Sequence, residues 1–384
     1  MINMKLNMKN FYGKTTPGAA LGKGVKKRGY VEDRMRIGAV IECLKDLPDE
    51  SVQCVVTSPP YYKAREYPIP PDQWEAVTYS PMYGLPEIHV PAQEVQLGLE
   101  NKDVDFVGHL VAVFRELRRV LRKDGVCFVN MGDSAAKGKV GRDDNAKFYA
   151  ATHGYESKSV DHCHAAARSS MAGKNIMGIP WRLALALQAD GWILRQDLIW
   201  HKPNPMPESV RDRCTRAHEY IFMLVKSPRY KWNLLQEVAT KRASGNKNQH
   251  DRLPGEREGD NANIRGSLHK IHPRETRNKR SVWTIAPDSF KEAHYATFPP
   301  TLPKLCITAA TDCGDTVLDP FCGSGTTAMV AHQLGREWIG IDRDNRAIDF
   351  TKKRIYKTDT KSAVGSTQPL FKTTPGPSLG KEGN

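Results

Sequence analysis

The stretch that most constrains the fold of this 384-residue chain is DTVLDPFCGSGTTAMVAHQLGREWIGID, residues 315–342. A short apolar run ends at Asp319, a tight turn with Gly323 and Gly325 follows, and a helical pattern leads to a second apolar run ending at Asp342. Strand, glycine turn, helix and strand in this order are typical of nucleotide-binding α/β units, where glycines let the backbone approach a ligand. The second acid, about 20 residues after the turn, can hold two ribose hydroxyls.

The glycine pattern alone leaves the kind of ligand open. Position 328 is Ala and no Gly-Lys-Ser/Thr sequence completes a P-loop, so the pattern disfavours ATP. A nicotinamide cofactor stays open on the fold alone. A tight turn that binds nothing is also conceivable. Two acids in register with two glycines argue against such an empty turn.

The other apolar runs alternate between strand and helix patterns. We expect helices over Asp105–Arg122, stopped by Gly125, over Pro180–Ala189, and from Thr326 to a cap at Gly335. The expected strands are Met35–Ile37, Val52–Val56, Val126–Asn130, Trp192–Trp200, Tyr220–Val225, Thr316–Leu318 and Trp338–Ile341. Alternation of this kind predicts an α/β fold with a mainly parallel sheet that is covered on both faces.

A second informative stretch is TSPPYY, residues 57–62, which directly follows the apolar run SVQCVV. Proline has no N–H to donate to a sheet, so two successive prolines stop a strand. The chain therefore makes a rigid turn, with the Ser58 hydroxyl before the prolines and the Tyr61 ring after them. Such a turn at the end of a buried strand suggests a functional role rather than a packing role.

Basic residues outnumber acidic ones, with Lys+Arg 57 against Asp+Glu 43 and a formal net charge of +14. This excess favours a polyanionic partner, most often nucleic acid, although a merely basic protein is the alternative. The excess is concentrated in residues 1–36 and 241–280, which otherwise look irregular. We therefore expect contacts to a nucleic acid to come from the irregular basic stretches.

Several other classes of protein are disfavoured. No apolar run is as long as a membrane span and no signal peptide begins the chain, so we expect a cytoplasmic protein without a membrane partner. The eight cysteines form no CxxC pair, which disfavours disulfides and a zinc ribbon. Adjacent side chains rarely converge on one ion, so we interpret His162-Cys163-His164 as a solvated loop and predict no metal.

Together, TSPPYY and LDPFCGSGTT resemble the amino-group DNA methyltransferases, which move a methyl group from S-adenosylmethionine to an exocyclic base nitrogen. The SPPY element precedes the cofactor turn and a basic insert separates them, an order that resembles the β group of this family. Further matches within roughly residues 34–357 are LGLE at 97–100, NMGDS at 130–134, the run from 197 to 230, RNKRSVWTI at 277–285 and HYATFPPTLPK at 294–304. Ala39 departs from the pattern, because family members often carry an acid there beside the adenine ring.

The resemblance implies a circularly permuted Rossmann-like S-adenosylmethionine-dependent methyltransferase sheet, with helices on both faces and an irregular basic insert for target recognition. Permutation would bring TSPPY and DPFCGSG, which both follow strand ends, to one edge of the sheet, where ligands bind in open α/β folds. The expected parts are a flexible basic arm at 1–33, a catalytic half at 34–228, a target-recognition insert at 229–280, a cofactor-binding half at 281–357 and a disordered tail at 358–384.

An exocyclic amino nitrogen is a poor nucleophile, because its lone pair is delocalised into the ring. Two acceptors for its N–H groups, Ser58 Oγ and the Pro59 carbonyl, would draw it toward a tetrahedral shape, and Pro59-Pro60 would fix that carbonyl. The base must first be flipped out of the duplex, after which Tyr61 would stack on it. We expect Tyr62 to pack. No covalent intermediate is required, so Cys54 and Cys322 are interpreted as packing residues.

The remaining site residues fall into two groups. The expected cofactor-binding residues are Asp319, Pro320, Phe321, Gly323, Ser324, Gly325 and Thr326 at the methionine end, Asp342 at the ribose, and Phe298 and Pro299 nearby. The expected DNA-binding residues, mostly for phosphates, are Arg211, Arg213, Arg216, Arg274, Arg277, Lys279 and Arg280. A solvated basic surface is the alternative for the second group. The loop over residues 200–205 is expected beside the base pocket.

In the family, Ser before Pro-Pro-Tyr usually accompanies cytosine as the target and Asp accompanies adenine. Ser58 therefore favours the N4 amino group of cytosine in double-stranded DNA, with N6 of adenine as the alternative. A catalytically inactive DNA-binding relative, to which Ala39 gives some weight, also stays open, as does an RNA or protein methyltransferase. The expected role is restriction-modification or protection of phage or host DNA. The enzyme would act as a monomer or homodimer, and a cognate restriction endonuclease would act separately.

Overall fold

An eight-stranded sheet forms the centre of the computed structural model, which describes residues 31–136, 173–238, 276–288 and 298–362. The strand order is β1-β14-β13-β2-β7-β9-β8-β12. Their bounds are β1 Met35–Ile37, β14 Glu337–Asp342, β13 Thr316–Asp319, β2 Val52–Thr57, β7 Leu121–Met131, β9 His218–Val225, β8 Ile193–His201 and β12 Val282–Thr284. Only β9 runs antiparallel to its neighbours within this described sheet.

This sheet confirms the predicted strands and the predicted permutation. All seven expected strands are present, and β12 is an additional strand at the edge. In the centre, β13 from the C-terminal half pairs in parallel with β2 from the N-terminal half, with Val317 opposite Cys54 and Leu318 opposite Val55. The carboxyl ends of these two strands therefore lie side by side, although Thr57 and Asp319 are 262 positions apart in the sequence.

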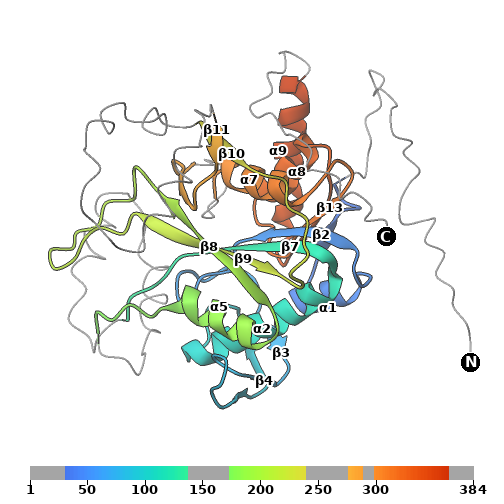
Figure 1. Cartoon of the computed structure of the whole chain (residues 1–384). Coiled ribbons are helices and arrows are strands. Elements are labelled where there is room, and N and C mark those ends of the chain that lie inside the picture. Colours follow the sequence, from blue (N-terminus) through green and yellow to red (C-terminus); the bar gives the residue numbers. More distant parts are fainter. Residues whose placement is uncertain (1–30, 137–172, 239–275, 289–297, 363–384) are drawn as a thin grey trace, which may run out of the picture.

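Six helices cover the two faces of the sheet in the described part of the chain (Figure 1). One face carries α1 Val40–Lys45, α2 Asp103–Val120 and α5 Ile179–Ala189; the other carries α7 Thr301–Ala310, α8 Thr326–Gln333 and α9 Arg346–Ser362. Successive strand residues point to opposite faces. Accordingly Val55 of β2 packs in the first core cluster, while Cys54 and Val56 pack in the second. The prediction of helices on both faces is confirmed.

The predicted helix ends are right in two cases and wrong in one. Helix α5 begins with Pro180 in its first turn, and α8 begins at Thr326 and is followed by Gly335 at a φ of 71°. Helix α2, however, ends at Val120 rather than at Arg122, because Leu121 is already extended and begins β7. Gly125 is not the stop of this helix. It lies inside β7, where a Cβ would come within 3.0 Å of the Gln53 carbonyl.

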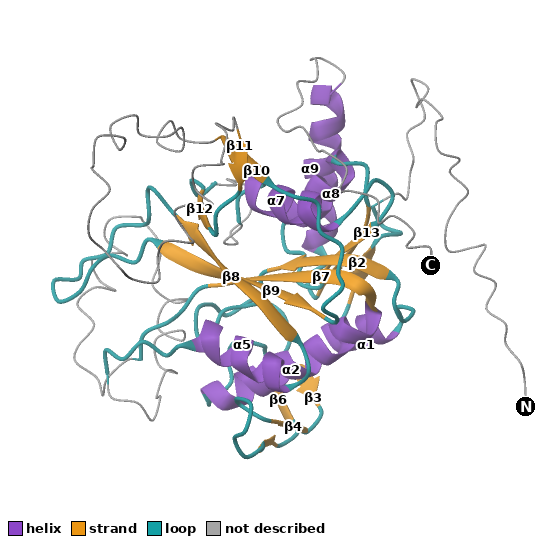
Figure 2. Ribbon diagram, in the orientation of Figure 1, coloured by secondary structure: helices purple, strands orange, loops and turns teal. Residues whose placement is uncertain are grey.

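Two short ribbons, which were not predicted from the sequence, lie against α2 (Figure 2). Strands β3 (Asp72–Trp74) and β6 (Gln93–Val95) form one, and β4 (Val77–Tyr79) and β5 (Ile88–Val90) form the other. Gly108 of α2 permits their close approach, since a Cβ there would lie 2.8 Å from Val90 Cγ2. These ribbons bury Gly108 and His109 of α2, against which Val90 and Trp74 pack.

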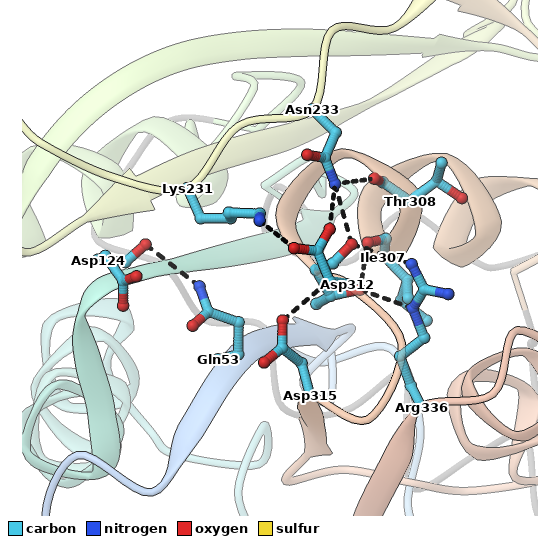
Figure 3. A network of polar contacts seen from close by, with 10 residues as sticks. Gln53, Asp124, Lys231, Asn233, Ile307, Thr308, Asp312, Asp315 and Arg336 are labelled. Carbon is cyan, nitrogen blue, oxygen red and sulfur yellow. Dashed lines mark hydrogen bonds and ion pairs between the residues drawn. The ribbon is translucent and has the colours of Figure 1, made fainter. Parts of the chain in front are cut away.

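Both ends of the expected insert are tied to the core. Strands β10 (Gln236–Val238) and β11 (Thr276–Asn278) pair antiparallel. Upstream of β10, Asn233 donates to the carbonyls of Thr308 and Thr311 at the end of α7, and Lys231 pairs with Asp312 (Figure 3). Residues 239–275, which include Arg274, lie outside the described residues. The proposed target-recognition insert thus leaves and re-enters the fold at one fixed ribbon.

The ends of the described chain are more ordered than the sequence suggested. Val31, placed in the expected arm, is fully buried, and Glu32 pairs with Lys352 of α9 at 2.5 Å. Helix α9 continues to Ser362, past the expected start of the tail at 358. The rest of the arm and tail, and His162-Cys163-His164, lie outside the described residues. None of the described helices is long and apolar enough to span a membrane.

Candidate active site

The two turns singled out in the sequence meet at the carboxyl ends of β2 and β13. Thr57 Oγ1, at the end of β2, donates to Asp319 Oδ1 at 2.8 Å, and Thr327 Oγ1 donates to Asp319 Oδ2 at 2.7 Å. The Thr327 hydroxyl also lies 3.3 Å from the Val56 carbonyl. Hence one buried carboxylate joins the strand that enters TSPPYY to the helix that leaves the glycine turn.

The glycine turn has the backbone that its sequence predicts. Gly323 and Gly325 have φ angles of 53° and 76°, which favour glycine, and Gly325 is the N-cap of α8. A Cβ on Gly325 would lie 2.8 Å from Thr351 Cβ and 2.9 Å from Thr351 Cα. Glycine is therefore needed at this position both for its conformation and for the close approach of α9.

The acid at the end of β14 holds the same turn from the other side. Asp342 Oδ2 accepts from the Gly323 amide at 2.7 Å, and Oδ1 accepts from the Asp344 amide at 2.9 Å. Each carboxylate oxygen has two lone-pair positions, so both oxygens can accept one further hydrogen bond. Asp342 can therefore accept from a pair of neighbouring hydroxyls, such as those of a ribose.

Asp319 is suited to a positively charged ligand group. Burial raises its pKa to about 6, because the donors that reach it in the described residues, two hydroxyls and the Phe321 amide, only partly offset desolvation. Its Oδ1 accepts two hydrogen bonds and its Oδ2 accepts one. One acceptor position on Oδ2 is therefore left for a ligand, and a cation there would stabilise the ionised carboxylate.

The remaining expected cofactor residues surround this turn or precede α7. Pro320 and Ser324 are buried, and Ser324 Oγ lies 3.4 Å from Thr326 Oγ1. Pro299 is buried at the start of α7, and Phe298 packs against the core cluster that contains Cys322.

Ala39 also lies beside this site. It is the N-cap of α1 and makes no side-chain cap, and the amide of the preceding Gly38 donates to the Asp342 carbonyl at 3.0 Å.

The TSPPYY turn is held rigidly against its surroundings. Pro59 is buried, while Ser58, Pro60 and Tyr61 are partly exposed. The carbonyl of Tyr61 faces Gly98, whose φ is 95° and whose Cβ, if present, would lie 3.0 Å from that oxygen. The Gly98 carbonyl accepts from the Lys63 amide at 2.7 Å. The LGLE stretch at residues 97–100 therefore holds the TSPPYY turn in place through Gly98.

The predicted packing roles in this region are confirmed. Tyr62 is 3% exposed and its ring lies 5.3 Å from that of Phe106. Cys54 and Cys322 are buried, and burial raises the pKa of each thiol far above its ordinary value. Both thiols therefore stay protonated at neutral pH.

A polar network behind Tyr61 was not predicted from the sequence. The Tyr61 hydroxyl donates to Glu219 Oε2 at 2.7 Å, Asn130 Nδ2 donates to the same oxygen at 3.1 Å, and Lys202 Nζ donates to Oε1. Ser58 Oγ lies 3.4 Å from the Tyr61 oxygen. One signal was available: Glu219 lies at the amino end of the apolar run HEYIFMLV. Since that strand runs antiparallel, this end lies at the same edge as the carboxyl ends of its neighbours.

Several of the expected DNA-binding residues are bonded within the protein. Arg211 is exposed, whereas Arg213 pairs with Glu208 at 2.6 Å. The Arg216 guanidinium donates to the Asp133 carbonyl. Within the expected insert, Glu237 Oε1 accepts from both expected arginines, and the Lys279 amide donates to the Leu235 carbonyl. The two arginine distances are 2.9 Å for Arg277 and 2.7 Å for Arg280.

Comparisons with known proteins agree with this architecture. Residues 52–353 match the N6/N4 family described as DNA methylase. The Type II methyltransferase M.Cfr9I of Citrobacter freundii is 37% identical over 326 residues, covering 84% of this chain and 87% of that protein. M.SmaI of Serratia marcescens is 34% identical over 324 residues, covering 84% and 90%. The PvuII DNA methyltransferase (cytosine-N4-specific) shares the fold, with a TM-score of 0.50 and 18% identity over 83% of this chain and 85% of that chain.

Proposed function

Because this chain belongs to the N6/N4 DNA methylase family, we propose that it transfers a methyl group from S-adenosylmethionine to the N4 amino group of cytosine in double-stranded DNA. The contact of Thr57 and Thr327 with Asp319 carries this proposal. It joins the turn that would hold a methyl donor to the turn that would hold an amino group. Two reactants that bind at these turns would meet without a large rearrangement of the protein.

The residues around the glycine turn fit the proposed cofactor. S-adenosylmethionine supplies an electrophilic methyl group on a sulfonium, together with a cationic amino group and a ribose. Asp319 would accept from the amino group at its remaining Oδ2 position, and Asp342 would accept from the two ribose hydroxyls. Gly323 and Gly325 keep the backbone open for this approach. Pro320, Phe321, Ser324 and Thr326 would complete the methionine end, and Phe298 and Pro299 would pack beside the cofactor.

The TSPPYY turn would prepare the nucleophile. Ser58 Oγ and the Pro59 carbonyl would accept the two amino hydrogens of a base flipped out of the duplex, which localises the nitrogen lone pair and aims it at the methyl group. The burial of Pro59 and the clamp by Gly98 fix the carbonyl before the base arrives. The Tyr61 ring would stack on the base. No covalent enzyme intermediate is needed, in agreement with the protonated state of the buried thiols.

DNA would bind along the side that carries the β8–β9 loop and the β10–β11 ribbon. Arg211 and Arg213 are exposed there, and Arg277 and Arg280 lie at the end of the insert, within and just after β11. These side chains would contact phosphates, and residues 229–280 would provide target recognition. Arg216 would act from within the protein by holding the loop at Asp133. Since the relatives are named as Type II methyltransferases, the proposed role is modification beside a separately acting restriction endonuclease.

The choice of base depends on Ser58, which precedes Pro-Pro-Tyr where an adenine enzyme of the family usually has Asp. N6 of adenine is the second candidate, and a catalytically inactive relative is the third. Incubation of the enzyme with labelled S-adenosylmethionine and either duplex DNA, RNA or a protein substrate tests which polymer is methylated. We expect label in DNA alone. Cofactor binding without transfer to DNA would support an inactive relative, and label in RNA or protein would contradict the proposal.

Cofactor affinity should fall as pH drops through about 6. The Asp319 pKa is raised to about 6 in the free protein, and a bound cation favours the ionised form, so binding is strong above this pH and weakens below it. About tenfold of affinity should be lost at pH 5 relative to pH 7. Titration of S-adenosylmethionine by calorimetry across this range measures the effect.

The matched control for this titration is an acid beside the other end of the same strand. Asp315 precedes β13 at its opposite end, where it accepts from the Asp312 amide at 2.8 Å. Asp315→Asn should leave the pH dependence unchanged, whereas Asp319→Asn should bind weakly and without this dependence. Wild-type affinity that stays constant between about pH 5 and 7 would contradict the role given to Asp319.

A further inference from the structure

In the polar network behind Tyr61, the donor and the acceptor of each hydrogen bond can be assigned. Glu219 is 14% exposed, and Lys202 and Asn130 donate to its two oxygens. An ionised carboxylate only accepts hydrogen bonds, so the Tyr61 hydroxyl must donate to Glu219. Burial and the nearby Glu219 charge raise the pKa of Tyr61 well above its ordinary value, so the phenol keeps the proton that it donates.

The donor in the Tyr61–Glu219 hydrogen bond determines the donor in the Ser58–Tyr61 hydrogen bond. A phenol has one hydrogen, and Tyr61 commits it to Glu219, so its oxygen is an acceptor toward Ser58 at 3.4 Å. Ser58 therefore donates its only hydrogen to Tyr61. Among the described residues no group donates to Ser58 Oγ, so its lone pairs are left for a hydrogen-bond donor from a ligand. An amino group is such a donor.

We propose that Glu219, held by Lys202, is a positioning residue that orients the Ser58 hydroxyl through Tyr61 so that Ser58 accepts a hydrogen bond from the amino group of the target base. This inference rests on the proposed function, because it concerns the same methyl transfer. It assigns Glu219 no contact with the base or the cofactor. A structural ion pair that merely joins β8 to β9 is the alternative, and it would not act through the Tyr61 hydroxyl.

A substitution that keeps the shape of Glu219 reverses the direction of the network. In Glu219→Gln, Lys202 can only donate, so the amide oxygen must face Lys202 and the amide NH₂ must face Tyr61. Tyr61 would then accept from the amide, and its own hydrogen would turn to one of the two oxygens that lie 3.4 Å away, Ser58 Oγ or Asn130 Oδ1. When Tyr61 donates to Ser58, the Ser58 hydrogen turns toward the amino group, where it opposes the N–H that Ser58 would otherwise accept. The single-turnover rate of methyl transfer should fall by about tenfold or more, the effect of one misdirected hydrogen bond.

A double-mutant cycle with Tyr61→Phe separates the proposal from the structural alternative. Phe keeps the ring but removes the hydroxyl, so Glu219 loses its route to Ser58. Glu219→Gln should therefore slow the wild type by about tenfold or more and slow the Tyr61→Phe enzyme by less than about twofold. Affinity for S-adenosylmethionine should stay at the wild-type value in all four proteins. Equal slowing in both backgrounds would overturn the proposal.

The matched control is Glu116→Gln, which removes the charge of another partly buried Glu. Glu116 pairs with Arg119 at 2.8 Å on α2, near the amino ends of the strands. The Glu116→Gln variant should transfer methyl groups at the wild-type rate.

If Glu219→Gln fails to fold, the Tyr61→Phe variant alone tests the proposal. It leaves Ser58 without its acceptor and should also slow transfer, and a wild-type rate would overturn the proposal. Absence of transfer by the wild type would instead contradict the proposed function.

Discussion

Replacing Ser58 by Ala should lower the single-turnover rate of methyl transfer by about 10²–10³, the loss typical of one preorganised hydrogen-bonding group at a reacting centre. The substitution removes one of the two acceptors for the amino hydrogens, while Pro59 and its carbonyl stay fixed by burial. Cofactor affinity should change little, because Thr57 rather than Ser58 contacts Asp319. Rapid-quench measurement of labelled DNA, together with calorimetric titration of the cofactor, separates these two effects.

The same strand offers a matched control for this experiment. Ser51 precedes β2 at its other end, where its hydroxyl donates to the Pro48 carbonyl at 2.7 Å. Ser51→Ala should transfer methyl groups at the wild-type rate. If Ser58→Ala also kept the wild-type rate, the proposed acceptor role of Ser58 would be wrong, and with it the main reason for choosing cytosine.

Gly325→Ala should destabilise the protein by about 2–5 kcal/mol and abolish cofactor binding. Two costs add at this position. An L-residue is strained at a φ of 76°, and the new Cβ would lie within 2.9 Å of Thr351 Cα, which belongs to a packed helix and can move away only with that helix. Denaturant unfolding and cofactor titration measure the two effects.

Gly314 separates the conformational cost from the cost of the close contact. Its φ is 86°, but no atom lies within 4 Å of the position that a Cβ would occupy. Gly314→Ala should therefore cost only about 1–2 kcal/mol, the penalty for the left-handed conformation, and should keep cofactor binding. Equal losses of unfolding free energy in the two variants would show that the contact with Thr351 is not required for the turn.

Local sequence patterns predicted the elements that depend on local chemistry. Apolar runs predicted all seven strands, most clearly β2, which is buried at every position, since strands covered on both faces are mostly apolar. The glycines of the cofactor turn were identifiable because their backbone angles favour glycine. The meeting of TSPPYY with this turn was predicted from the permuted sheet that the family resemblance implies, together with the rule that ligand sites gather at strand carboxyl ends.

Features that depend on distant partners were harder to predict. The end of α2 was misplaced because Leu121 is apolar and suits a helix as well as the buried strand that it begins. The β3–β6 ribbon has strands of three residues, too short for a periodic signal. Glu219 was missed because its partners, Tyr61, Asn130 and Lys202, come from three separate segments.

The internal partners of the expected DNA-binding residues also could not be predicted from the sequence. A cluster of arginines suggests a phosphate surface, but charge alone does not reveal internal partners. Glu237 bonds to both Arg277 and Arg280, and Arg216 donates to the Asp133 carbonyl. Only the folded chain distinguishes these side chains from Arg211, which is exposed on the β8–β9 loop.

The chemical identity of the methylated base tests the central claim most directly. Duplex DNA incubated with the protein and labelled S-adenosylmethionine is digested to nucleosides, which are separated and identified by mass. We expect the label in N4-methylcytosine with the wild-type protein and at least about 10²-fold less of it at equal times with Ser58→Ala. Label in N6-methyladenine, or no labelled nucleoside from a protein that binds the cofactor, would contradict the account.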